Sequence, residues 1–140
     1  MENSDLLRHQ IIKNLIAPDT EKVADVAVSL WEPMATKIIA IVGEGGFNSL
    51  YARSVFITHP TYSWLDTHAP STSPNHRFME LKTSFERQTS AHASAANSLL
   101  LINFTDILAV LIGEHLTMSI LRSAWGNDAF EKVDKEFKNE

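Results

Sequence analysis

Two Arg-Ser dipeptides are the side chains of this sequence best suited to binding chemistry. Arg53-Ser54 and Arg122-Ser123 stand at matching places in the two halves of the chain. An arginine presents a planar fork of donors that holds a carboxylate or phosphate in bidentate fashion, and a serine hydroxyl adds a further donor. Two such pairs related by symmetry would clamp a small anion between them.

The two arginines can also have a structural role, because charged residues near or within apolar runs need partners. Each of the two arginines is expected to pair with Glu44 or Glu114, which would tie a helix to the opposite corner and need no ligand. Lys37 and Asp106 have opposite charges and lie within apolar runs, where an unpaired charge is costly. We therefore expect a salt bridge between Lys37 and Asp106, while the arginines stay open to either role.

No pattern in the sequence predicts a metal site or a catalytic centre. His76 and Glu80 are four residues apart, on one face of an expected helix, but no second pair of this kind follows. The chain has no cysteine and no Gly-x-Ser-x-Gly element, which removes thiolate chemistry and a nucleophile elbow. We expect no catalytic residue, no metal and no cofactor, and an enzyme is the less favoured class.

A glycine cluster, Gly-Glu-Gly-Gly at residues 43–46, precedes an expected helix. Amide groups at a helix start attract anions, so a phosphate loop is one interpretation. The Gly-Lys-Ser/Thr ending and the preceding strand of a nucleotide loop are absent. The favoured interpretation is a corner between two helices.

The two halves of the chain resemble each other at an offset of 69. The segments 24–56 and 93–125 are aligned without gaps, and a duplicated helical unit would give the fold a pseudo-two-fold axis. The identical pairs are Ala24/Ala93, Ser29/Ser98, Leu30/Leu99, Thr36/Thr105, Ile38/Ile107, Ala40/Ala109, Arg53/Arg122 and Ser54/Ser123.

Apolar spacing predicts a helical chain without strands. Leu, Ile, Val and aromatic residues recur every three or four positions, which is typical of amphipathic helices. Pro33 lies inside one of these runs, so we expect a kink near Glu32. The expected helices cover residues 3–16, 20–42, 47–57, 76–112 and 116–125, with another from residue 128. The sequence therefore predicts an all-α fold, a single-domain bundle of about five to six helices over residues 1–140.

Two segments carry apolar side chains that suit an interface. Tyr62 and Trp64 lie in the long irregular stretch 59–75, which is expected to fold back on the body as a packed loop. Phe130, Val133 and Phe137 form a stripe on the C-terminal helix, which is too short to be stable alone and must dock on its own core or on a partner.

Composition limits the functional classes. The 140 residues are 44 % hydrophobic and 21 % charged, with a net charge of −5, which disfavours non-specific nucleic-acid binding. The longest apolar stretch is interrupted by polar residues and shorter than a bilayer requires, so no membrane span is expected. The acidic N-terminal residues differ from a secretory signal, so a cytoplasmic location is expected.

These observations favour a non-enzymatic cytoplasmic adaptor or regulatory module that works through protein–protein contacts, with a homodimer as the expected assembly. The alternative is a small-ligand sensor that holds an anion in a pocket between the two repeat units. A pocket lined by Arg53 and Arg122 would favour the sensor, whereas a solid core with an exposed apolar patch would favour the adaptor.

Overall fold

The computed structural model describes residues 2–16, 22–65 and 77–126. All the regular structure in these ranges is helical, which confirms the predicted all-α bundle. The helices are α1 (Glu2–Leu15), α2 (Val23–Thr58), α3 (Met79–Glu86), α4 (Ser90–Ile112) and α5 (Glu114–Trp125). The helix predicted from residue 128, with Phe130, Val133 and Phe137, lies outside the described residues.

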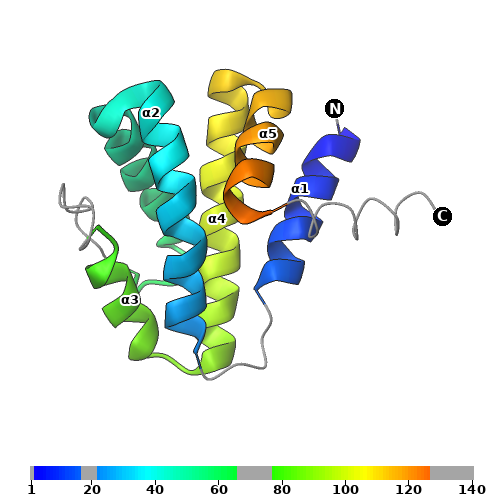
Figure 1. Cartoon of the computed structure of the whole chain (residues 1–140). Coiled ribbons are helices and arrows are strands. Elements are labelled where there is room, and N and C mark those ends of the chain that lie inside the picture. The colour runs from blue at the N-terminus through cyan, green and yellow to red at the C-terminus, as the bar shows by residue number, and fades with distance from the viewer. Residues whose placement is uncertain (1, 17–21, 66–76, 127–140) are drawn as a thin grey trace.

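Two glycine corners give the bundle its shape. Gly43 has φ 82° and ψ 166°, and it divides α2 into an N-terminal arm (residues 23–42) and a C-terminal arm (residues 44–58). Gly113 has φ 96° and ψ 151°, and it separates α4 from α5. Side chains with a Cβ rarely adopt such positive φ values, so glycine is required at both corners. Figure 1 shows both corners at the same end of the bundle. The predicted corner at residues 43–46 is therefore confirmed.

Aromatic residues fill the centre of the bundle between the two arms of α2 and α4. The Trp31 ring lies 5.4 Å from that of Tyr51 and 5.2 Å from that of Phe104, both edge to face. Phe47 lies 5.4 Å from Phe104. The buried Trp31 Nε1 donates to Asn97 Oδ1 at 2.9 Å, so its one polar atom is satisfied. Aromatic rings thus pack against each other between the two halves of the chain.

The repeat at an offset of 69 is not confirmed. That register would place the exposed Thr36 on the buried Thr105, and the buried Ser54 on the exposed Ser123. Burial recurs instead at an offset of 70, which also aligns Gly43 with Gly113. The buried pairs in this register are 23/93, 24/94, 27/97, 30/100, 31/101, 34/104, 35/105, 38/108, 47/117, 50/120 and 51/121. The structure shows two helix–glycine–helix segments that share many of their buried positions.

Two other boundaries differ from prediction. Residues 76–112 do not form one helix, because Thr89 caps a new helix by accepting a hydrogen bond from the His92 amide at 3.2 Å. Pro33 leaves the backbone dihedral angles of α2 helical, and the non-helical residue inside α2 is Gly43.

By length and composition alone, α2 and α4 are each long and apolar enough to cross a membrane, which the interrupted apolar runs of the sequence did not predict. Both helices also contribute buried apolar side chains to the core of the bundle. The outward positions of the α2 N-terminal arm are mainly polar, and they include Asp25, Ser29, Glu32, Thr36 and Lys37.

Candidate functional site

The two Arg-Ser pairs do not meet in a described cavity. Arg53 and Arg122 are exposed, on the C-terminal arm of α2 and on α5. Ser54 is buried and donates to the Leu50 carbonyl at 2.7 Å, whereas Ser123 is exposed. Neither arginine lines the cavities described below, so a shared anion clamp remains a prediction without a described pocket.

The carboxylates proposed as partners of these arginines bind other residues. Glu44 Oε1 lies 3.3 Å from Arg77 Nη2, and Glu114 Oε2 lies 2.9 Å from Arg8 Nε. Arg53 and Arg122 were the expected partners of these two glutamates, and the ion pairs described are with Arg77 and Arg8 instead. Each glutamate directly follows a glycine corner, and the arginine that reaches it comes from another segment that packs beside the corner.

The expected salt bridge between Lys37 and Asp106 is also wrong. Asp106 Oδ1 accepts from Arg8 Nη1 at 2.6 Å and lies 2.8 Å from His9 Nε2. Lys37 is exposed on the outer side of α2. The physical reason is that Asp106 lies on the side of α4 that α1 covers, a side that the apolar run in the sequence does not reveal.

Arg8 is the centre of a buried polar cluster that sequence reasoning missed. Its side chain is 1 % exposed, and it donates to Thr105 Oγ1 at 2.7 Å in addition to Asp106 and both carboxylate oxygens of Glu114. Burial lowers the pKa of Arg8, but the hydrogen bonds and charges of Glu114 and Asp106 outweigh it, so the pKa is raised. The cluster ties α1 to α4 and α5. A sequence signal did exist, because Arg8 shares a helix face with Ile11 and Ile12.

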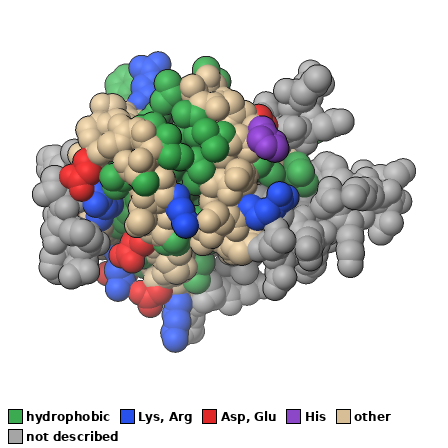
Figure 2. Space-filling view, turned by 45° about the horizontal axis from the view of Figure 1, so that its top comes forward, with side chains coloured by type: hydrophobic (Ala, Val, Ile, Leu, Met, Phe, Trp, Pro, Cys, Tyr) green, Lys and Arg blue, Asp and Glu red, His purple; other side chains and the backbone are tan. Residues whose placement is uncertain are grey.

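Exposed aliphatic side chains surround the two glycine corners. We call the apolar tip the set Ile41, Val110, Leu111 and Leu116. Val110 is 90 % exposed and Leu111 is 61 % exposed, although both belong to the core helix α4. Figure 2, in which this end of the bundle comes forward, shows hydrophobic side chains gathered in the middle of the face. Such a patch is a candidate contact surface.

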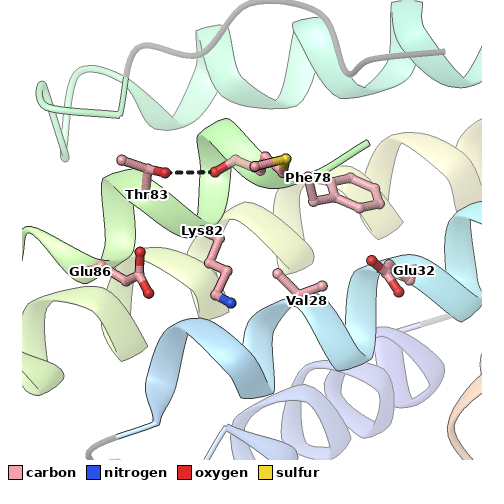
Figure 3. Close-up of a pocket in the computed structure, with 7 residues that line it drawn as sticks. Val28, Glu32, Phe78, Lys82, Thr83 and Glu86 are labelled. Atoms are coloured by element: carbon pink, nitrogen blue, oxygen red, sulfur yellow. Dashed lines mark hydrogen bonds between the residues drawn. The ribbon is translucent and has the colours of Figure 1, made fainter. Parts of the chain in front are cut away.

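A groove with two adjoining cavities follows α3 where it packs beside the N-terminal arm of α2. The cavity of about 390 Å³ has Val28, Phe78 and Met79 as apolar lining, and Glu32 and Glu86 lie at its two ends with Lys82 between them (Figure 3).

The second cavity, of about 330 Å³, shares Glu32 with the first and is lined also by Pro33, Thr36 and Arg77. The groove thus combines apolar surface with charges of both signs, which is typical of small-molecule sites.

No known protein family matches this chain, and neither a curated protein nor a solved structure is similar to it. The geometry therefore carries the functional argument alone.

The remaining predicted residues have ordinary environments or lie outside the described part. Tyr62 and Trp64 are half-buried, and the Trp64 ring lies 6.0 Å from that of Phe85, so the start of the 59–75 loop packs on the body. Their role in an interface remains a prediction. In the ranges the structure describes, no three His, Asp or Glu side chains are grouped to hold a metal ion.

Proposed function

We propose that this chain is a non-enzymatic module that acts through protein–protein contact, with the apolar tip as its contact surface. The observation that carries the proposal is the exposure of four large aliphatic side chains above a filled aromatic core. Leaving such side chains in water forgoes about 1.5–3 kcal/mol for each one that a partner would bury completely. A partner that covers the tip recovers part of this free energy.

The partner we propose is a second copy of the chain. In a two-fold dimer the same patch of both copies meets, so the tip needs to complement only itself. The net charge of −5 opposes approach through other faces, whereas the tip residues carry no charge. The two carboxylates beside the tip are each held by an arginine, Glu44 by Arg77 and Glu114 by Arg8.

Sedimentation velocity of the full chain tests this proposal. The wild type is expected to dimerise, and Val110→Glu is expected to be monomeric, because a charge at the centre of an apolar contact is not compensated. Phe56→Glu is the matched control, since Phe56 is 73 % exposed but lies on the C-terminal arm of α2, away from the tip. A wild type that stays monomeric at about 0.5 mM, a weak-association limit, contradicts the second-copy assignment.

We propose a cytoplasmic location for the module, because polar side chains on the outer face of α2 suit contact with water. Asp25, Glu32 and Lys37 would each be costly in a hydrocarbon environment. A carbonate wash of host membranes tests this point: the chain is expected in the soluble fraction, and retention in the pellet would contradict the proposal.

The alternative, an anion sensor with a pocket between the two halves, lacks support from the cavities described. The interface between the two halves is occupied by Trp31, Phe47 and Phe104.

A further inference from the structure

Arg77 is the least satisfied cation in the groove between α2 and α3. Its side chain is 9 % exposed, and Nη2 donates to Glu44 at 3.3 Å, a long hydrogen bond. Nη1 is buried and has no hydrogen-bond partner. A buried guanidinium nitrogen without an acceptor carries a desolvation cost, which a ligand acceptor would remove. Arg77 lines the cavity of about 330 Å³, so a bound molecule has room beside it.

Glu32 stands beside Arg77 and belongs to both cavities. The structure gives it no ion pair with a described cation, and Figure 3 shows its carboxylate at the edge of the larger cavity. Pro33 follows it and has no N–H, which leaves the Ser29 carbonyl without its helical donor. Glu32 and Arg77 thus line the same cavity.

Apolar surface begins directly beyond Glu32. Val28, Phe78 and Met79 line the cavity of about 390 Å³, and the Phe78 ring projects from the N-terminal end of α3 (Figure 3). Lys82, farther along, is held by Asp25 at 3.0 Å, so its charge is already matched. The order along the groove is thus a partly satisfied arginine, a carboxylate without an ion pair among the described residues and an apolar wall.

We propose that this groove binds a free α-amino acid with an apolar side chain. A rotation of the Arg77 side chain turns Nη1 toward the cavity that Arg77 lines, where the ligand carboxylate accepts from it. The ammonium group donates to Glu32, and the side chain packs against Val28 and Phe78. A simple anion would meet the charge of Glu32, and a simple amine would meet that of Arg77, so a zwitterion fits the pair best. Both cavities are within the usual size range of small-molecule sites.

Isothermal titration of the full chain tests the proposal with L-leucine and L-phenylalanine as probes. L-Leucinamide lacks the carboxylate and 4-methylpentanoate lacks the ammonium group, and each is expected to bind at least about tenfold more weakly than L-leucine. Arg77→Met and Glu32→Gln are expected to weaken L-leucine by a similar factor. Lys13→Met, which changes an exposed cation on α1 outside the groove, should leave the affinity unchanged.

Three results would overturn the inference. They are no heat with either amino acid up to about 10 mM, equal binding of 4-methylpentanoate and L-leucine, or unchanged binding in Glu32→Gln. Glu32 is exposed, so this variant remains informative even if Arg77→Met fails to fold. Failure here leaves the apolar tip untouched, because the tip is tested by assembly rather than by ligand binding.

Discussion

Arg8 anchors α1 through charge-assisted hydrogen bonds to Asp106 and Glu114. The arginine and the two carboxylates differ in their exposure to solvent. Arg8 is buried and keeps its positive charge at any ordinary pH, whereas Asp106 is 44 % exposed and Glu114 is 21 % exposed. Removing the arginine leaves carboxylates that water can reach, while replacing both carboxylates takes two anionic acceptors away from a buried cation.

This asymmetry gives a stability prediction. Arg8→Met is expected to lower the free energy of unfolding by about 2 kcal/mol, because solvent screens the exposed partners. The double variant Asp106→Asn with Glu114→Gln is expected to lose more, about 3–5 kcal/mol. Urea denaturation followed by circular dichroism measures both. A larger loss in Arg8→Met than in the double variant would contradict the account.

The raised pKa of Arg8 fixes the sign of its pH dependence. A group whose pKa is higher in the folded state stabilises the fold below its unfolded pKa, and the contribution is lost as pH rises through the folded value. For Arg8 this loss lies above the already high ordinary pKa of an arginine. The stability difference between wild type and Arg8→Met is therefore expected to be the same at about pH 7 and pH 10. A difference that shrinks toward pH 10 would count against it.

At the residue scale, the sequence indicated which charges need partners but not which partners they have. Asp106 was correctly identified as a charge that requires compensation. Its cation, Arg8, is 98 positions away in the sequence and comes from a helix outside the two similar segments. Spacing along one chain segment cannot show which face of α4 is covered by α1, so Lys37 was chosen instead.

At the scale of elements, the two glycine corners set the direction of four helical segments. A Cβ at Gly43 or Gly113 would meet no heavy atom within 4 Å, so the cost of a substitution there comes from the positive φ and not from a clash. We expect Gly43→Ala and Gly113→Ala each to lower the free energy of unfolding by about 1–2 kcal/mol.

Gly45→Ala is the matched control for these variants. Gly45 has the same open space but no positive φ, and it lies within the α2 helix. Alanine is expected there to be neutral or to stabilise by up to about 1 kcal/mol. Thermal and urea unfolding measure all three variants, and an equal loss in Gly45→Ala would show that the corners have no special backbone requirement.

The helical secondary structure was predictable from apolar spacing. The positions of the helix breaks and the offset that relates the two halves were harder to predict. The start of α4 depends on the side chain of Thr89 as a cap, a local choice within a continuous apolar pattern. The offset of 69 was chosen from identical residues such as Arg53 and Arg122, which are exposed, and not from buried positions. The buried positions recur at an offset larger by one residue, and this offset also aligns Gly43 with Gly113.

At the scale of the whole molecule, aromatic side chains fill the core, and the exposed side chains of the apolar tip lie outside it. Trp31, Phe47 and Phe104 pack between the two halves, so we place the proposed ligand in the groove beside α3 and the proposed contact surface at the corners. Neither surface was predictable from the sequence, because Val110 and Leu111 continue the apolar pattern of a core helix. Val110 and Leu111 are exposed because they lie at the end of α4, beyond Leu108, its last core residue.

The measurement that tests the central claim most directly is the distance between spin labels on two copies of the chain. The sequence has no cysteine, so Val110→Cys and Phe56→Cys each carry a single label. Double electron–electron resonance is expected to give a short, well-defined distance for labels at 110 and a longer or unresolved one for labels at 56. Dimers in which the labels at 56 are closer than those at 110, or in which labels at 110 show no dipolar coupling, would contradict contact through the apolar tip.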